Sequence, residues 1–271
     1  MNLKFFVLAL LLLASPSALA QDAPHPDRDT LCAIGRGKAC EIQQAIDKGL
    51  FETGLRPRFP DHAKCRGIDE KWAISYTWKR GKEQYHGGID MPAPFGTPII
   101  AAADGEVVGV FDGVDGYRGR EVILRHSPQD SGLPVWTYTQ YSHFEELPAL
   151  KLGERVKQGQ VLGPTGNSGR GRKSTAQSTN RRPAIHFAAY FSPSEHFVIS
   201  KDSVVVPVEG QWMDPNALFR GKLPLDSASL KALPEAEKEI PVAVMFPDGE
   251  VFPTGAKIVW PYVCASTKKG R

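Results

Sequence analysis

Residues 120–143 read REVILRHSPQDSGLPVWTYTQYSH, and this stretch decides the fold class. Two runs rich in Val, Ile, Tyr and Thr, Arg120–His126 and Val135–His143, flank a short connection that contains Gly and Pro. β-Branched and aromatic residues favour strands, whereas Gly and Pro favour the turns between them. The stretch therefore predicts two neighbouring antiparallel strands.

The same pattern continues on both sides of this stretch. Further strands are predicted at Ile99–Ala103, Gly105–Phe111, Gln160–Gly163 and Pro183–Phe191. No repeat of about 20 to 50 residues is visible, which argues against a solenoid or a propeller. We therefore expect a mainly β domain at residues 68–220, an antiparallel sheet that folds over to form a groove.

The N-terminal residues carry other signals. Lys4, an apolar run and the sequence Ala18-Leu19-Ala20 predict a signal peptide over residues 1–20 that is cleaved on export to the periplasm or beyond. The alternative is a membrane anchor, but a span needs about 20 apolar residues and about ten are present. We expect no stable membrane span after cleavage. Residues 21–67 predict a flexible leader over 21–31 and a short amphipathic helix in Glu41–Leu50.

Residues 221–271 form a predicted C-terminal extension. Mixed charge and prolines in residues 221–240 are typical of a linker. Two short apolar runs then flank Asp248-Gly249, a pair that suits the turn of a β-hairpin.

Charge and cysteines narrow the class of protein. The chain has 33 Lys and Arg residues and 30 Asp and Glu residues, which gives a formal net charge of +3. This excess is far smaller than that of a typical nucleic-acid-binding protein, so we expect no nucleic-acid partner. Four cysteines in an exported chain predict two disulfides, for which three pairings exist. The short loop between Cys32 and Cys40 favours that pair, leaving Cys65 for Cys264.

Two separated segments carry metal-ligand residue types. His86-Gly87-Gly88-Ile89-Asp90 places an imidazole and a carboxylate four residues apart, with glycines that permit tight turns. In Pro183–Phe191, strand alternation puts Ala184 and His186 on one face. Two imidazoles and one carboxylate leave a fourth position for water, as catalytic zinc sites do. Separately, each histidine is also compatible with an ordinary hydrogen-bonding role.

Two further features lie near these segments in the predicted sheet. Alternation places Tyr141 and His143 on one strand face, where His143 could hydrogen-bond a developing oxyanion. Residues 170–182 carry five cations and no acid, and end in Arg181-Arg182. We interpret Tyr141, Arg181 and Arg182 as substrate-binding candidates, since arginine pairs bidentately with carboxylates. The alternative for the loop is a solvated segment.

Together, these stretches resemble peptidase family M23, the zinc endopeptidases of the lysostaphin and LytM type that cut peptidoglycan. His86–Asp90 fits the His-x-Gly-x-Asp element, and Tyr141–His143 fits Tyr-x-His. The segments Phe95–Gly105, Gly153–Gly163 and Gly166–Gly169 resemble the strands and the Gly-Asn-Ser-Gly turn of that family.

The resemblance implies a LytM-like, duplicated-hybrid-motif fold and a Zn²⁺ site of His86, Asp90 and His186, with His143 as a catalytic residue. The family's last element is His-x-His, and Ala184 stands at its first position. A general base typically contributes about 10² to 10⁴ in rate, so this departure bears directly on activity. His196 lies ten residues beyond His186, and a chain reversal could return it to the site as a substitute.

Three hypotheses follow. The first is an exported zinc metallopeptidase that acts on peptidoglycan peptide cross-links. The second is a catalytically impaired M23-like module that binds peptidoglycan or regulates a partner cell-wall hydrolase. The third is a structural zinc site, which usually has four protein ligands, although the sequence offers three. Retention of all three ligands favours the enzyme.

Overall fold

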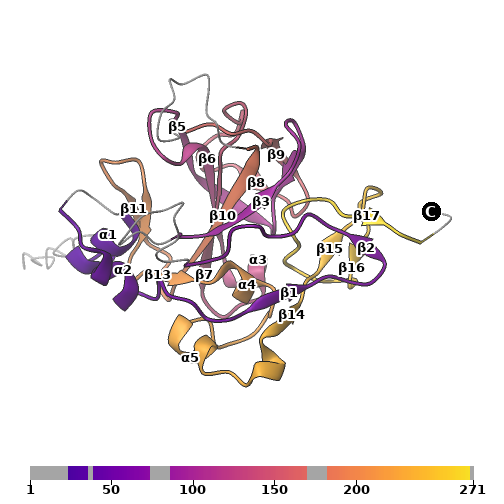
Figure 1. Cartoon of the computed structure of the whole chain (residues 1–271). Helices are drawn as coiled ribbons and strands as arrows, with labels where there is room; N and C mark the ends of the chain where they lie inside the picture. Colours follow the sequence, from indigo (N-terminus) through magenta and orange to yellow (C-terminus); the bar gives the residue numbers. More distant parts are fainter. Residues whose placement is uncertain (1–23, 36–38, 74–85, 170–181, 269–271) are drawn as a thin grey trace, which may run out of the picture.

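The computed structural model describes residues 24–35, 39–73, 86–169 and 182–268. A seven-stranded sheet forms its centre, in the order β13-β10-β7-β6-β5-β8 with β3 also paired to β10 (Figure 1). Its strands are β3 (Ile89–Pro92), β5 (Gly105–Gly113), β6 (Gly119–His126), β7 (Trp136–Ser142), β8 (Arg155–Val156), β10 (Ala184–Ser192) and β13 (Gln211–Met213). All of these pairings are antiparallel, so the predicted fold class is confirmed.

Two-stranded sheets surround this centre. The antiparallel pairs are β4 (Pro98–Ile100) with β9 (Val161–Pro164), β11 (Phe197–Ile199) with β12 (Val205–Pro207), β15 (Val244–Met245) with β16 (Val251–Phe252), and β2 (Ala63–Lys64) with β17 (Ala265–Ser266). The strands β1 (Arg56–Arg58) and β14 (Glu239–Pro241) pair in parallel. The predicted strands correspond to β4, β5, β6, β7, β9 and β10, whereas β1, β2 and β3 were not predicted as strands.

The helices are short. They are α1 (Arg28–Gly35), α2 (Ile42–Asp47), α3 (Pro128–Ser131), α4 (Pro215–Leu218), α5 (Ser227–Lys231) and the 3₁₀ turn η1 (Glu235–Glu237). The predicted helix is α2, but the prediction of a flexible leader over residues 21–31 is wrong from Arg28 onward. There α1 buries Ile34, and the Ala33 carbonyl accepts a hydrogen bond from the Trp212 indole at 2.9 Å.

The C-terminal extension has the predicted hairpin, with Gly249 at φ +84° in the turn between β15 and β16. The linker character expected for residues 221–240 is wrong. Leu225, Leu230 and Ile240 are buried, because this segment packs its apolar side chains into the molecule's main core.

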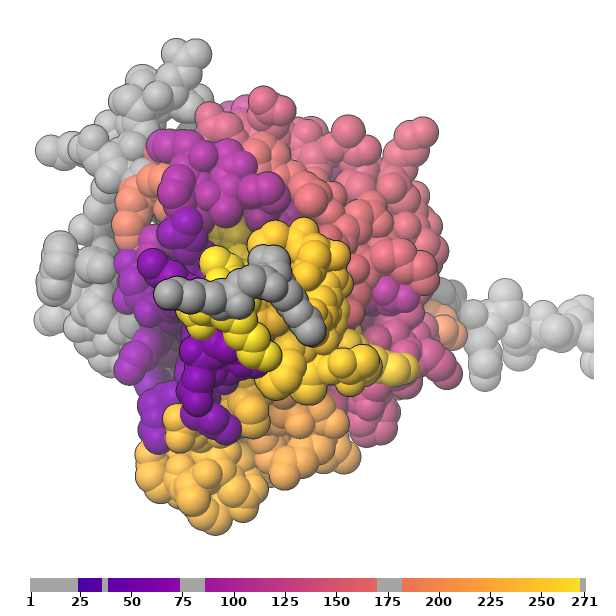
Figure 2. Space-filling model, turned by 90° about the vertical axis from the view of Figure 1, so that its right-hand side faces the viewer, coloured from indigo at the N-terminus to yellow at the C-terminus, as the bar shows by residue number. Residues whose placement is uncertain are grey.

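The segment that holds β1 and β2 lies beside the C-terminal extension. The pairs β1–β14 and β2–β17 join the two, and Figure 2 shows yellow C-terminal residues against purple residues of the N-terminal third. The predicted disulfides are both present, Cys32–Cys40 and Cys65–Cys264. The predicted signal peptide, residues 1–20, lies outside the described residues. None of the described helices is long and apolar enough to cross a membrane.

Candidate metal centre

Two adjacent strands bring the separated ligand segments together. β3 carries Asp90 and pairs antiparallel with β10, where Asp90 lies directly opposite His186. Directly paired residues share a face of the sheet, so register alone aims the carboxylate and the imidazole to one side. His86 precedes β3 and reaches the same point, as the motif spacing predicts.

The three side chains converge at one point. His86 Nε2 lies 3.1 Å from Asp90 Oδ1 and 2.9 Å from His186 Nδ1, and His186 Nδ1 lies 3.0 Å from the same carboxylate oxygen. His86 and Asp90 are each 2% exposed, while the side chain of His186 keeps 15% of its exposure. Within the described part of the chain, these residues form the one cluster of metal-ligand types close enough to share an ion.

The chemistry of this donor set fits a divalent cation. His86 Nδ1 donates to the Lys71 carbonyl at 3.0 Å, which leaves the neutral ring with its lone pair on Nε2. That lone pair faces a carboxylate oxygen and a second imidazole nitrogen, an arrangement that needs a proton or a cation between them. Ligand atoms at about 2.0–2.2 Å from tetrahedral Zn²⁺ stand about 3.3–3.5 Å apart, close to the observed spacing.

The electrostatics support the same interpretation. Burial raises the pKa of Asp90, but the adjacent imidazoles of His86 and His186 outweigh burial and hold that pKa well below its ordinary range. Asp90 is therefore an ionised carboxylate, the form that binds a metal. Gly88 lets its own chain segment approach β10, since a Cβ there would lie 2.7 Å from His186 Nε2 and 2.6 Å from the Phe187 carbonyl oxygen.

His143 lies next to this cluster. Its ring centre is 6.0 Å from that of His186, and its Nδ1 donates to the Ser168 carbonyl at 2.7 Å. That hydrogen bond places the acceptor lone pair of the neutral ring on Nε2. The chain reaches this position through φ +75° at His143, where β7 has already ended.

This backbone conformation overturns one expectation. Tyr141 and His143 do not share a strand face, because the left-handed residue after Ser142 breaks the alternation. Tyr141 is fully buried, with its ring 5.2 Å from that of Phe187 and its hydroxyl accepting from the Ala102 amide. Tyr141 therefore exposes no surface to a substrate here.

The remaining predicted residues are placed as follows. Ala184 is fully buried beside Pro92 in the β3–β10 register and donates its amide to the Gly166 carbonyl. Arg182 forms an ion pair with Asp69. Arg181 and the basic loop before it lie outside the described residues.

The other histidines do not join the cluster. His126 is buried at the far end of β6, between the Asp104 carbonyl and the Thr139 hydroxyl. His196 is exposed and follows the end of β10 at Ser192, opposite to the end that holds His186, so it does not replace an imidazole near Ala184.

Sequence reasoning missed the supporting groups. The carbonyls of Lys71 and Ser168 orient His86 and His143, and main-chain groups leave no signature in a sequence. A buried acid, Glu121, also lies on the sheet face of the cluster, paired with Ser142. Its signal in the sequence was an acid directly before the apolar run Val122–Leu124.

Comparison with known proteins gives these observations a context. The model of peptidase family M23 matches residues 84–197, which include all three candidate ligands and His143. This segment is thus similar to peptidase family M23. The resemblance inferred from the motifs is thereby confirmed at the level of the family.

Two relatives of this segment are peptidases by their names, and one of the names specifies peptidoglycan. The chain is 42% identical over 91 residues to the peptidoglycan DD-endopeptidase ShyC of Vibrio cholerae, covering 33% of this chain and 18% of that one. It is 31% identical over 172 residues to the DD-carboxypeptidase/endopeptidase Mpg of Neisseria meningitidis, covering 63% and 32%. The chain thus spans less than a third of the length of either relative.

Among solved structures, the catalytic domain of lysostaphin from Staphylococcus simulans is 22% identical to this chain. The match covers 52% of this chain and 89% of that domain, with a TM-score of 0.35.

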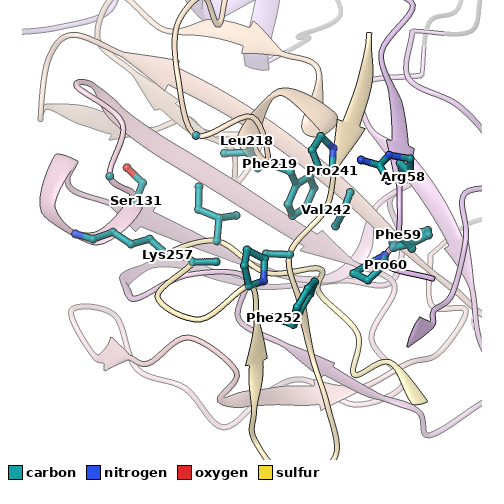
Figure 3. A pocket seen from close by; sticks show the side chains of 16 residues that line it. Arg58, Phe59, Pro60, Ser131, Leu218, Phe219, Pro241, Val242, Phe252 and Lys257 are labelled. Carbon is teal, nitrogen blue, oxygen red and sulfur yellow. The ribbon is translucent and has the colours of Figure 1, made fainter. Parts of the chain in front are cut away.

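One pocket of about 500 Å³ lies beside α3 and α4, and none of its lining residues belongs to the cluster of His86, Asp90 and His186. Figure 3 shows apolar side chains around it, with Lys257 and Arg58 on opposite sides. Lys257 donates to the Gln129 carbonyl and Arg58 lies 3.9 Å from Glu239, so both cations have partners.

Proposed function

We propose that this chain is an exported zinc metallopeptidase that cleaves peptide cross-links of peptidoglycan. One observation carries the proposal: His86 Nε2, Asp90 Oδ1 and His186 Nδ1 meet at one point beside His143. The match of this segment to a peptidase family and the peptidases among its relatives, one of which is named a peptidoglycan DD-endopeptidase, support it. The predicted signal peptide supports a reaction in the cell envelope.

Different residues of the chain bind the metal and transfer the proton in this proposal. Two neutral imidazoles and one carboxylate would hold Zn²⁺, and a bound ion would supply Lewis-acid activation of water and of the scissile carbonyl. His143 accepts a proton at Nε2, because its Nδ1 proton is engaged by the Ser168 carbonyl. Once protonated, the same atom donates a hydrogen bond to the negative charge that develops on the substrate oxygen.

A second candidate function has one specific observation in its favour. Ala184 supplies no base where the M23 resemblance expects a histidine, so His143 is the single auxiliary imidazole. A module of this kind would hold zinc and bind peptidoglycan, and it would cleave the polymer slowly or not at all.

Zinc content and cleavage together test the proposal. We expect the mature protein to contain one zinc per chain by elemental analysis, and His86→Ala to lose it together with cleavage of purified peptidoglycan. His196→Ala is the matched control, since this exposed histidine lies beyond the far end of β10. Wild type and His86→Ala that bind equally little zinc would refute the site, and a zinc-loaded but inactive wild type would favour the binding module.

A further inference from the structure

A polar row crosses the sheet on the face of the metal cluster. The row consists of four residues, each paired with the next one on the neighbouring strand: Asp90 on β3, His186 on β10, Ser142 on β7 and Glu121 on β6. Directly paired residues point to the same side of a sheet. Since strands lie about 4.8 Å apart, Glu121 stands about 10 Å from His186 along this row.

Glu121 is buried and fixed in one orientation. It is 3% exposed, and its Oε2 accepts hydrogen bonds from the Gln140 amide and from Ser142 Oγ, the latter at 3.2 Å. The Tyr190 hydroxyl in turn holds Gln140 at 2.5 Å. A buried carboxylate is costly unless it is paired, so this network needs a cation to complete it.

Arg118 supplies that cation from the loop between β5 and β6. Its Nε lies 3.3 Å from Glu121 Oε1, and its Nη2 donates to the Asp202 carbonyl at 3.4 Å. The side chain nevertheless keeps 35% of its exposure. In the part of the chain that the structure describes, no acceptor is found for Nη1, so one edge of the guanidinium remains for an external anion.

We propose that Arg118, held in place by Glu121, binds a carboxylate of the peptide substrate. This inference rests on the proposed function and adds a specificity determinant to it. An extended peptide advances about 3.3 Å per residue, so a carboxylate about three residues from the cleaved bond reaches Arg118. The planar guanidinium suits a carboxylate because two parallel N–H groups match its two oxygens. Glu121 is the positioning residue, acting through Arg118.

The test compares two substrates that differ in charge alone. One is a purified cross-linked muropeptide with free side-chain carboxylates, and the other is the same muropeptide with those carboxylates amidated. We expect wild type to prefer the free acid by about tenfold to a hundredfold in kcat/KM, the range of one charged hydrogen bond. Arg118→Ala removes the preference by raising KM for the acid substrate, with kcat unchanged. Glu121→Gln weakens the preference while zinc content stays that of wild type.

Arg56→Ala is the matched control, since Arg56 is also a surface arginine paired with an acid, Glu235, on a terminal segment. It should keep the wild-type preference. Equal losses on both substrates in Arg118→Ala, or no preference in wild type, would overturn the inference. If wild type cleaves neither muropeptide, the proposed function fails, and dissociation constants for the same pair then decide the role of Arg118: a tighter acid complex that Arg118→Ala abolishes supports it, and equal constants refute it.

Discussion

At the residue scale, Ala184 stands where the M23 resemblance expects a histidine. It shares the sheet face of His186 and is fully buried next to Pro92. We expect Ala184→His to add a proton acceptor beside the metal and to raise peptidoglycan cleavage about tenfold or more, within the range typical of general bases. Rates for wild type, Ala184→His and Ala184→Asn check this, because asparagine adds a polar side chain without a base. An Ala184→His rate no higher than that of Ala184→Asn would contradict the expectation.

Gly88 makes a second prediction at this scale. A Cβ there would press on His186 Nε2 and on the Phe187 carbonyl, both nearer than 3 Å. The Phe187 contact involves backbone of the central sheet, so the strain falls on the ligand histidine. We expect Gly88→Ala to weaken zinc affinity by about tenfold to a hundredfold, the effect typical of disturbed ligand orientation. Competition with a chelator measures it, and Gly67→Ala is the control, since Gly67 has open space beside it and no left-handed backbone.

At the scale of the element, the N-cap of α4 is a buried acid. The Asp214 carboxylate accepts hydrogen bonds from the Asn216 amide at 2.9 Å and from the Thr53 hydroxyl. Burial nevertheless raises the pKa of Asp214 to about 6. In the unfolded chain the pKa of an aspartate is about 3.9, so the folded state binds the proton of Asp214 more tightly. The contribution of this proton to the free energy of unfolding is therefore complete below pH about 4 and is lost as the pH rises to about 6.

This shift predicts a pH-dependent difference between wild type and Asp214→Asn. A difference of about two pKa units between the folded and the unfolded state corresponds to about 3 kcal/mol. The free energy of unfolding of wild type should therefore fall by about 3 kcal/mol relative to that of Asp214→Asn between pH 4 and 6. Urea unfolding at several pH values measures the difference. Asp226→Asn is the control, because Asp226 caps α5 in the same way at the surface, through Ser229. Parallel pH curves for wild type and Asp214→Asn would contradict the prediction.

At the scale of the whole molecule, strand pairs and a disulfide join the segment before the M23 match to the C-terminal extension. Cys65 and Cys264 are 199 residues apart in sequence, and Trp260 is fully buried with its indole donating to the Arg66 carbonyl at 2.8 Å. On the chain-entropy view, closing a loop of that length stabilises by about 5 kcal/mol, whereas the short Cys32–Cys40 loop gives about 2 to 3 kcal/mol.

Removing each disulfide separately checks this difference. We expect Cys65→Ala/Cys264→Ala to lose about twice the unfolding free energy that Cys32→Ala/Cys40→Ala loses, because loop entropy grows with loop length. Urea unfolding of the two double variants gives both values. A larger loss for Cys32→Ala/Cys40→Ala would contradict the prediction. It would show that local packing around α1 stabilises the protein more than the loop closed by Cys65–Cys264 does.

The sequence by itself determined the strand pattern, the resemblance to family M23 and the candidate ligand set. Alternating apolar runs with Gly and Pro between them predicted the central strands, since these signals are local. The motif spacing gave His86 and Asp90, and strand alternation put Ala184 and His186 on one face. The short loop between Cys32 and Cys40 predicted the first disulfide, and the two remaining cysteines predicted the second.

The tertiary structure decided what depends on contacts between distant segments. The register of β3 against β10 brings Asp90 to His186, and the left-handed backbone at His143 turns that ring toward the cluster while Tyr141 stays in the core. The linker expected before β14 is instead packed, because burial of Leu230 is set by partners far away in the chain. Arg118 meets Glu121 only once the β5–β6 loop folds over the sheet. Such pairings are non-local, so no window of sequence contains them.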